Sequence, residues 1–318
     1  MTQRLRILLT GASSFTGYWF AKTLAEAGHQ LVCTFTSNLD RYDGVRKLRV
    51  QQLRGLCEMV PNAPFGSDTF INLLQNHGPW SLLCHHGAEV TNYKSPDFNV
   101  HQALVNNTQN LRSVLSAFKQ AGGRGVVLTG SVFEPDEGVG EEPLRAFSPY
   151  GLSKGLTWQV FRFYCGEAGL PLGKFVIPNP FGPYEEQRFT FYLMSSWKRG
   201  SVATVKTPDY VRDNIHVSLL AAVYKRFAGQ VAQTEKPILK CNPSGYVEPQ
   251  GAFAQRVARE VRKRTGWPCE LHLQQQTEFT EPRVRHNFEP AAAMVETWDE
   301  TAAWNEFTEY YLKLEANA

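Results

Sequence analysis

The first 28 residues constrain the fold more than any other part of the chain. Leu5 to Leu9 form a short apolar run, TGASSFTG follows at 10–17, and the next residues carry apolar side chains at helical spacing until Gly28. The run predicts a buried strand, the glycines predict a turn, and the spacing of Phe20 and Leu24 predicts one apolar helix face. A strand, a glycine-containing turn and a helix in this order are typical of the first unit of a doubly wound α/β sheet.

The turn carries the residue types that the pyrophosphate of a dinucleotide requires. Gly11 permits a tight turn, and Gly17 permits close packing between helix and strand. The first N–H groups of the helix then face the turn, where the helix dipole also favours an anion. Ser14 replaces the middle glycine of the usual fingerprint, which narrows the room for a phosphate but supplies a hydroxyl donor. The predicted pyrophosphate contacts are Gly11, Ser13, Ser14, Phe15, Thr16 and Gly17.

Strand and helix patterns alternate along the first 178 residues. Apolar runs at 31–35, 56–60, 80–85, 126–128 and 172–177 are separated by helical patterns at 44–54, 67–78, 97–120 and 148–168. This alternation predicts an α/β fold with a Rossmann-type doubly wound parallel sheet in a domain over 1–178. After Pro178 the chain becomes rich in Pro and Gly. Residues 179–318 are therefore expected to form mainly a smaller C-terminal substrate-binding lobe, with a return to the first domain near 210–241.

The composition narrows the partners and the compartment. A net charge of +3, without a compact Lys/Arg run among aromatic residues, does not favour nucleic acid as a partner. Six cysteines are scattered without metal-ligand spacing, and Cys84-His85-His86 would alternate between the faces of a strand, so no metal site is expected. The apolar run at the N-terminus is too short for a signal peptide, and no stretch is long enough to cross a membrane. These features predict a cytoplasmic protein in a reducing compartment.

The end of the second predicted strand bears on the choice of cofactor. An NAD site usually has a carboxylate here for the ribose 2′-hydroxyl, whereas residues 35–38 are FTSN and Arg41 follows. Hydroxyl and guanidinium groups suit a 2′-phosphate, so Thr36, Ser37 and Arg41 favour NADP. The alternative, that Arg41 is only a solvated loop charge, leaves NAD open. Gly87, after the fourth predicted strand, would let the cofactor approach the backbone closely.

The stretch SPYGLSK, at 148–154, has the features of a catalytic site. Ser148 is a good helix N-cap, so a helix is expected to begin just before Tyr150. Tyr150 and Lys154 are four residues apart and project from one helix face. An ammonium at that distance lowers the pKa of a phenol toward the range that is useful for acid–base catalysis.

Five motifs in a fixed order give the chain a family resemblance. They are TGASSFTG, Ser131 at the end of the strand VVLTGS, the Tyr150 and Lys154 pair, PNPFGP and VRDNIHV. With them the chain resembles, over nearly its whole length, the extended short-chain dehydrogenase/reductase family, and within it the nucleotide-sugar epimerases, dehydratases and reductases. The resemblance implies that Tyr150 is the acid–base at the sugar, that Lys154 holds the nicotinamide ribose, and that a hydroxyl completes a triad. That hydroxyl is Ser131 if the strand VVLTGS is aligned with the strand of the family. It is Thr129 if Val132-Phe133 is aligned with the Val-Tyr pair of the family. Ser131 is preferred, because the strand is the firmer anchor.

The resemblance also implies further contacts and an assembly. Asn179 and Arg212 match the residues that meet the phosphates of a nucleotide sugar, and Asn106 matches a helix asparagine near the active site. Homodimers built through two helices of the Rossmann domain are common in the family and are expected here. Together with the other candidates, the predicted cofactor contacts then include Asn106, Lys154 and Pro178, and the predicted substrate contacts are Glu89, Ser131, Tyr150, Asn179, Arg188, Arg212 and Arg283.

Two activities of the family are disfavoured by absent residues. The 4,6-dehydratases carry an Asp-Glu pair directly after the triad threonine, which neither Thr129 nor Ser131 has, and the members that combine 3,5-epimerisation with reduction have a Cys where Val132 stands. The predicted activity is therefore that of an NAD(P)-dependent oxidoreductase on a nucleotide-activated sugar, with an NADPH-dependent 4-keto reductase as the leading interpretation. A nucleotide-sugar 4-epimerase with tightly bound NAD is the alternative, because it shares every catalytic residue. A non-catalytic dinucleotide-sensing regulator is a further alternative.

Overall fold

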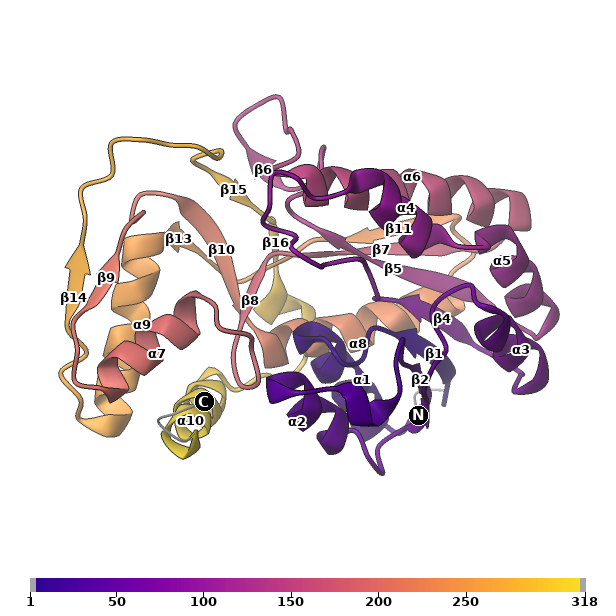
Figure 1. Ribbon diagram of the computed structural model, residues 1–318, viewed down its shortest axis with the longest axis horizontal. Helices are drawn as coiled ribbons and strands as arrows, with labels where there is room; N and C mark the ends of the chain where they lie inside the picture. The colour runs from indigo at the N-terminus through magenta and orange to yellow at the C-terminus, as the bar shows by residue number, and fades with distance from the viewer. Residues whose placement is uncertain (1–3, 315–318) are drawn as a thin grey trace. The chain divides into compact units, whose positions relative to one another are not determined.

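The computed structural model describes residues 4–314, and its largest feature is a seven-stranded sheet whose neighbouring strands are parallel (Figure 1). This sheet confirms the predicted doubly wound α/β fold. The strand order reverses between β1 and β4, the place at which such sheets bind ligands beyond the carboxyl ends of their strands. In spatial order the strands are β11 (Ile238–Cys241), β7 (Leu172–Ile177), β5 (Gly125–Ser131), β4 (Leu82–His85), β1 (Arg6–Thr10), β2 (Gln30–Thr34) and β3 (Glu58–Val60).

Helices cover both faces of this sheet. On one face α3, α5 and α6 share an apolar core to which Phe118, Trp158 and Phe161 belong. On the other face α1 meets α8, and the rings of Phe20 and Tyr224 stack with their centroids 3.8 Å apart. The helices that accompany the sheet are α1 (Phe15–Glu26), η1 (Leu39–Arg41), α2 (Gly44–Gln52), α3 (Asp68–Asn76), α4 (Val100–Thr108), α5 (Leu111–Gln120), α6 (Pro149–Ala168) and α8 (Val217–Gln233).

Serine side chains begin three of these helices. Ser14, Ser67 and Ser148 each accept a hydrogen bond from a backbone N–H in the first turn of α1, α3 and α6. α6 ends at Gly169, which adopts the left-handed conformation that commonly terminates a helix. The predicted helix at 148–168 and the predicted strand at 172–177 are therefore confirmed.

The single helix predicted over 97–120 is wrong, because the chain forms α4 and α5 there. α4 ends at Thr108, and Asn110 takes a left-handed conformation (φ 50°) before α5 begins. Asparagine tolerates this conformation better than most residues. Its Nδ2 also donates a hydrogen bond to the Gly66 carbonyl oxygen at 2.9 Å. Asn110 thus marks a helix boundary inside the stretch predicted as one helix.

The chain divides into two compact units. The first extends to Glu137 and includes 145–177 and 221–242; the second contains 138–144, 178–220 and the chain from Pro243 onward. In the second unit, α7, α9 and α10 enclose an apolar core around Phe181 and Phe253. Its strands form one three-stranded sheet, β13-β10-β8, and three two-stranded pairs, β12-β16, β14-β9 and β15-β6. The elements of this unit are β6 (Val139–Gly140), β8 (Asn179–Phe181), α7 (Phe189–Lys198), β9 (Ala203–Val205), β10 (Val211–His216), β12 (Pro243–Ser244), β13 (Tyr246–Pro249), α9 (Gln250–Thr265), β14 (Leu271–Leu273), β15 (Arg285–His286), β16 (Glu289–Pro290), η2 (Ala291–Met294) and α10 (Glu300–Lys313).

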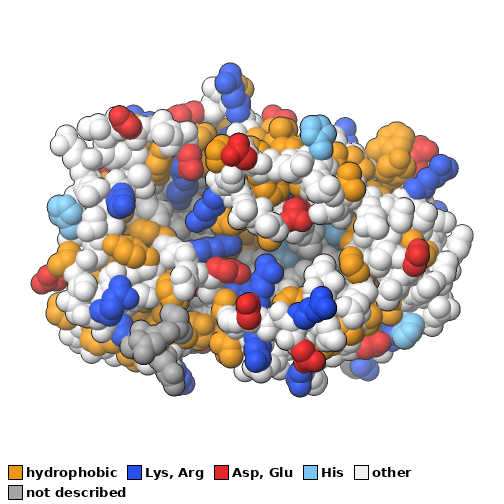
Figure 2. Space-filling view, in the orientation of Figure 1, with side chains coloured by type: hydrophobic (Ala, Val, Ile, Leu, Met, Phe, Trp, Pro, Cys, Tyr) orange, Lys and Arg blue, Asp and Glu red, His pale blue; other side chains and the backbone are white. Residues whose placement is uncertain are grey.

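The surface is of mixed character. On the face drawn in Figure 2, Lys and Arg side chains are interspersed with Asp, Glu and apolar side chains. All six cysteines are free thiols. In the part of the chain that the structure describes, no helix is both long and apolar enough to span a bilayer.

Candidate active site

The carboxyl ends of β1 and β4 meet where the strand order reverses. Thr10 and His85 are register partners there, and the Thr10 hydroxyl lies 3.0 Å from His85 Nδ1. The same hydroxyl accepts a hydrogen bond from the Gly87 N–H at 2.8 Å. These bonds hold the segment after β4 against the turn after β1, so a Cβ on Gly11 would lie only 2.7 Å from the Gly87 nitrogen. The structure therefore brings the predicted cofactor residues Gly11 and Gly87 into contact.

The turn between β1 and α1 presents the start of a helix to this edge of the sheet. Gly11 has a φ of +77°, and a Cβ on Gly17 would lie 2.1 Å from the Gly11 carbonyl oxygen. The Ser14 hydroxyl donates to that oxygen at 2.8 Å and accepts from the Gly17 N–H at 3.1 Å. The sequence predicts that this hydroxyl donates to a phosphate. In the structure it is instead bonded within the turn. Backbone N–H groups in the first turn of α1 remain as the donors suited to a pyrophosphate.

His86 is a site residue that the sequence did not reveal. Its Nε2 lies 3.0 Å from the Ser14 hydroxyl and 3.1 Å from the Thr16 hydroxyl, and its Nδ1 lies 3.0 Å from the Thr129 hydroxyl. Burial and the charge on Lys154 lower the pKa of His86 to about 3, so the ring is neutral. A neutral imidazole offers one donor and one acceptor. His86 therefore links the cofactor turn to the end of β5.

The amide that reaches the end of β4 is Asn107, not the predicted Asn106. Asn107 is buried; its backbone oxygen lies 3.1 Å from His85 Nε2, and its side-chain oxygen accepts from the Glu89 N–H at 2.8 Å. Asn106 is exposed, and its Nδ2 donates to the Glu89 carboxylate at 3.0 Å. Neighbouring helix residues point about 100° apart, so only one of two adjacent amides can face the sheet. Glu89 is held by α4 through both its backbone and its carboxylate.

Tyr150 lies in the first turn of α6, next to the loop that follows β5. A Cβ on Gly151 would lie 2.2 Å from the Phe133 backbone oxygen, so the start of the helix is in close contact with that loop. The Tyr150 ring makes edge contacts with Tyr93 and Phe98, with centroids 5.4 and 5.9 Å apart. These contacts hold the phenol ring half-buried at the carboxyl-end edge of the sheet.

Lys154 is buried one turn further along α6. Its Nζ donates a hydrogen bond to the Thr129 backbone oxygen at 2.5 Å. Burial lowers the pKa of Lys154 to about 8; the Glu134 carboxylate counteracts this effect, and the Lys174 ammonium adds to it. Lys154 is therefore mostly charged at neutral pH. The ammonium and the phenol share one helix face, as the four-residue spacing predicted.

The two candidate triad hydroxyls have different partners. Thr129 is buried, and its hydroxyl lies against His86 at 3.0 Å. Ser131 is half-buried at the end of β5, and its hydroxyl accepts a hydrogen bond from the Phe133 N–H at 3.2 Å. The two side chains point to the same face of the sheet because they are two residues apart. Ser131 lies nearer the loop that contacts α6, so it remains the preferred partner of Tyr150.

The residues predicted to select the cofactor follow β2. Thr36 is exposed, Ser37 is half-buried, and Arg41 is exposed in η1. A different arginine reaches the cofactor turn: Arg49 of α2 is fully buried, and its guanidinium donates to the Ser13 backbone oxygen at 3.0 Å. Its long distance along the sequence from the turn explains why no motif revealed it.

The second unit carries four of the predicted substrate residues. Asn179 opens β8 after the buried Pro178, and its Nδ2 is buried without a hydrogen-bond partner among residues 4–314. Asn214 is its register partner on β10, and the Nδ2 of Asn214 is likewise buried without a hydrogen-bond partner among the described residues. Buried amides are normally paired, so these two donors suit a polar ligand.

The three arginines of this set differ in their surroundings. Arg212 on β10 is buried; it donates to the Glu281 carboxylate at 3.0 Å and to the Pro282 backbone oxygen at 2.9 Å. Arg283 is exposed and lies over the Phe279 ring. Arg188 is the N-cap residue of α7, and its guanidinium lies 3.8 Å from Glu186. Arg212 is the one whose charge is held inside the fold.

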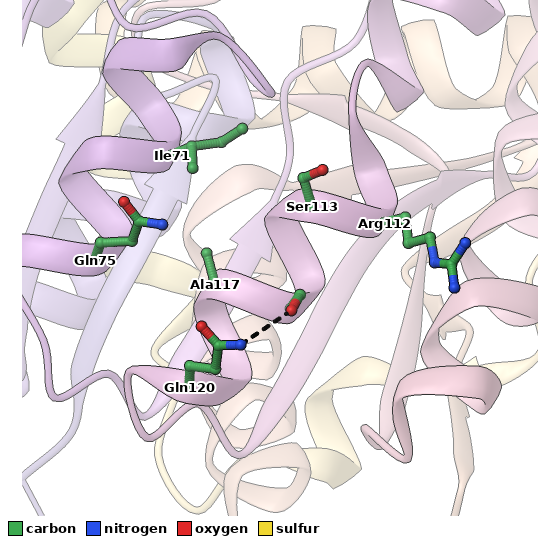
Figure 3. A pocket seen from close by; sticks show the side chains of 7 residues that line it. Ile71, Gln75, Arg112, Ser113, Ala117 and Gln120 are labelled. Carbon is green, nitrogen blue, oxygen red and sulfur yellow. Dashed lines mark hydrogen bonds between the residues drawn. The ribbon is translucent and has the colours of Figure 1, made fainter.

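A shallow depression on the outer side of α3 and α5 is separate from these residues (Figure 3). Ile71 and Gln75 line it from α3, and Ser116 and Gln120 line it from α5, where Gln120 Nε2 donates to the Ser116 hydroxyl at 3.4 Å. It contains none of the predicted site residues and no carboxylate. We therefore place the candidate active site at the carboxyl ends of the strands.

Comparison with known proteins gives the family. A model of the NAD dependent epimerase/dehydratase family matches residues 7–239, which is most of the chain. The chain belongs to this family. It is therefore an enzyme of the extended short-chain dehydrogenase/reductase type, as the five motifs predicted. No curated protein matches the chain in sequence.

Solved structures of this family share the fold over almost the whole chain. A UDP-glucose 4-epimerase from Stenotrophomonas maltophila with NAD is 18% identical, with a TM-score of 0.75 over 97% of this chain and 98% of its own. A UDP-glucuronic acid 4-epimerase variant from Bacillus cereus with NAD is 15% identical, with a TM-score of 0.73 over 98% and 100%. A dTDP-glucose 4,6-dehydratase from Streptomyces venezuelae with NAD is 14% identical, with a TM-score of 0.72 over 97% of both chains. At these identities the likeness establishes the shared fold.

Proposed function

We propose that the protein is a 4-epimerase of a nucleotide-activated sugar that uses a tightly bound NAD. The observation that carries this proposal is the arrangement of Tyr150 and Lys154 on α6, with Lys154 bonded to the end of β5. Two 4-epimerases among the structural neighbours, both with NAD, support it over the reductase interpretation. The absence of an Asp-Glu pair after Thr129 or Ser131 speaks against a dehydratase.

The residues fit a dinucleotide at the edge of the sheet. The turn at Gly11 and Gly17 has no room for side chains, and the first N–H groups of α1 would donate to the pyrophosphate of a bound dinucleotide. Lys154 would hold the nicotinamide ribose. Bound there, NAD would accept a hydride from the sugar C4 and later return it.

The protein's own groups then have defined tasks. Tyr150 takes the proton of the C4 hydroxyl as the carbon is oxidised and returns it to the oxygen when the carbon is reduced. The charge on Lys154 favours the phenolate form of Tyr150. Ser131 would hold the same sugar oxygen through a hydrogen bond. Asn179 and Arg212 in the second unit would bind the phosphates of the nucleotide sugar.

The second candidate is an NADPH-dependent 4-keto reductase. One observation favours it: residues 30–39, which include β2 and the start of η1, contain no carboxylate for a ribose 2′-hydroxyl. Thr36, Ser37 and the exposed Arg41 would then face a 2′-phosphate. The two candidates differ in whether the cofactor stays bound between turnovers.

We also propose a cytoplasmic homodimer. Val105 on α4 and Leu152, Leu156 and Phe163 on α6 are exposed apolar side chains. The two helices pack against each other, so these residues lie on neighbouring elements. An apolar helix pair of this kind suits a second copy of the chain. The six free thiols support the reducing compartment.

The first test is on the purified protein itself. We expect denaturation to release NAD in about equal amount to the protein, and we expect the intact protein to interconvert UDP- or dTDP-hexoses that differ at C4. An empty site that exchanges NADPH freely would support the reductase instead. The absence of any nicotinamide binding would contradict both.

Replacing Tyr150 separates an enzyme from a sensor. Tyr150→Phe should lower turnover at least about a hundredfold, because it removes the acid–base group while the apolar ring contacts remain. Bound NAD should be retained, which is the control for folding. A Tyr150→Phe protein with full turnover would contradict the role of the phenol.

A further inference from the structure

A buried lysine and two carboxylates form a charged cluster next to the end of β5, where the candidate hydroxyls lie. Lys174 Nζ donates to the Glu134 carboxylate at 2.5 Å and to the Glu137 carboxylate at 2.6 Å. The side chains of Glu134 and Lys174 are only 1% and 2% exposed. Lys240 and Asn242 complete the group by donating to Glu137 at 2.9 and 3.3 Å.

The fold does not require this pair. Lys174 stands in the middle of β7, a central parallel strand of the kind that is normally apolar throughout. Removing two charges from water costs free energy that their attraction often fails to recover, and apolar replacements are commonly neutral or stabilising. A retained buried pair therefore needs a reason other than stability.

Glu134 is bonded to the end of the strand that carries the candidate hydroxyls. Its Oε1 accepts a hydrogen bond from the Ser131 N–H at 2.8 Å, and its own N–H donates to the Ser131 backbone oxygen at 3.1 Å. Both backbone groups of Ser131 are thus fixed by one residue. Gly130 leaves the space for this contact, since a Cβ there would lie 2.8 Å from Lys174 Cε and 3.0 Å from Glu134 Oε1.

The charges of the same pair act on the ammonium of Lys154. Burial lowers the pKa of Lys154 to about 8, the Glu134 carboxylate opposes that shift, and the Lys174 ammonium reinforces it. Glu137, on the other side of Lys174, has Lys240 as a second cation. The titratable and charged groups around Lys154 are Glu134 and Lys174, His85 at the end of β4, His86 directly after it, and Tyr150 on its own helix.

We propose that Glu134 is a positioning residue for the reaction at Tyr150, held in place by Lys174. It fixes the backbone of Ser131 and supplies the negative charge that keeps Lys154 protonated. The Lys174 ammonium opposes the effect of the Glu134 carboxylate, so the two charges together determine how fully Lys154 is protonated. This proposal rests on the proposed function for its effect on turnover; for its effect on Lys154 it rests on the contacts of Lys154 and Glu134 at the end of β5 and on the charges of the pair.

The kinetic test uses three single variants and the pH dependence of kcat. Glu134→Gln should lower kcat about tenfold, leave KM within about twofold, and move the alkaline limb of the kcat profile down by about one pH unit. Lys174→Met should move that limb to higher pH. Glu137→Gln is the matched control, because it also removes a carboxylate that pairs with Lys174, but Glu137 is not bonded to Ser131. Its kcat profile should coincide with that of the wild type. Equal shifts for Glu134→Gln and Glu137→Gln, or no shift for either, would overturn the proposal.

A spectroscopic test is independent of turnover. With ¹⁵N-labelled lysine, the Lys154 Nζ signal is assigned by its loss in Lys154→Met and titrated between pH 6 and 11. It should titrate at lower pH in Glu134→Gln and at higher pH in Lys174→Met. An unchanged titration would overturn the proposal even in an active enzyme, whereas the expected shifts in a protein without turnover would uphold the charge balance and reject only the epimerase.

A double variant covers the case in which a single change prevents folding. Glu134→Gln combined with Lys174→Met removes both charges of the pair and leaves Glu137 with Lys240 as its cation, so it should remain folded. Glutamine still offers an oxygen to the Ser131 N–H, and the two lost charges act on Lys154 in opposite directions, so the alkaline limb of the variant's kcat profile should lie close to that of the wild type. A limb displaced in this double variant by about one pH unit in either direction would overturn the proposal.

Discussion

Glu185 is buried in the second unit, where two hydroxyl groups are its hydrogen-bond partners. Thr190 of α7 donates to its Oε1 at 2.5 Å, and Tyr311 of α10 donates to the same oxygen. Burial raises the pKa of Glu185 from 4.5 to about 7, with Arg188 and the two hydroxyls opposing the shift and Glu186 adding to it. This carboxyl group makes the stability of the folded chain depend on pH.

The folded state binds one more proton than the unfolded state between pH 4.5 and about 7. The free energy of unfolding should therefore fall as the pH rises through this window, by about 3 kcal/mol in total. Glu185→Gln keeps an oxygen acceptor but cannot ionise, so it should be less dependent on pH and more stable than the wild type at pH 8. Urea unfolding at pH 5, 6, 7 and 8 measures both effects.

Glu309→Gln is the control for this prediction, because Glu309 lies on the exposed side of α10 and pairs only weakly with Lys313. Its pH profile should follow that of the wild type. A wild-type stability that does not change over this range, together with an identical profile for Glu185→Gln, would contradict the raised pKa.

At the scale of the element, two helix glycines of the first unit have opposite surroundings. A Cβ on Gly17, in the first turn of α1, would lie 2.1 Å from the Gly11 backbone oxygen and 2.8 Å from the His86 ring. A Cβ on Gly229, in α8, would meet no atom within 4 Å. The first glycine allows α1 to approach the cofactor turn, whereas the second only lowers the stability of its helix.

Alanine at these two positions should therefore have opposite effects. Gly17→Ala should destabilise the protein by about 1–3 kcal/mol through overpacking and should weaken dinucleotide binding, because the turn must move. Gly229→Ala should stabilise it by about 1 kcal/mol and leave binding unchanged. Chemical unfolding and titration with NAD measure the two quantities. Tight NAD binding by Gly17→Ala would show that the close approach is not required.

At the scale of the whole molecule, features that depend on consecutive residues could be predicted from the sequence, whereas contacts between distant residues could not. The sheet, α6 and the pair of Tyr150 and Lys154 were predicted, because periodicity and a four-residue spacing are properties of consecutive residues. His86, Asn107 and Lys174 were not, because their roles depend on partners brought together by the fold. A buried lysine in an apolar strand was the one visible sign of the network around Glu134.

The exposed apolar side chains of α4 and α6 give the last prediction, which concerns assembly. Phe163 and Val105 are 62% and 58% exposed, more than any other large apolar residue named on the described surface. A stable interface buries about 800 Å² on each partner and usually depends on a few large side chains near its centre. If this face joins two copies, Phe163→Glu should raise the dimer dissociation constant at least about thirtyfold, which corresponds to about 2 kcal/mol.

Sedimentation over a range of protein concentrations measures that constant. The comparison is Leu312→Glu, which places the same charge at an exposed apolar residue of α10 and should leave the dimer unchanged. Because Phe163 is exposed in the single chain, its replacement should not alter the free energy of unfolding of the monomer by more than about 0.5 kcal/mol. A loss of dimer in Phe163→Glu alone would therefore report the contact between copies rather than a folding defect. A wild-type protein that remains monomeric at micromolar concentration, or equal loss in both variants, would exclude this face as the interface.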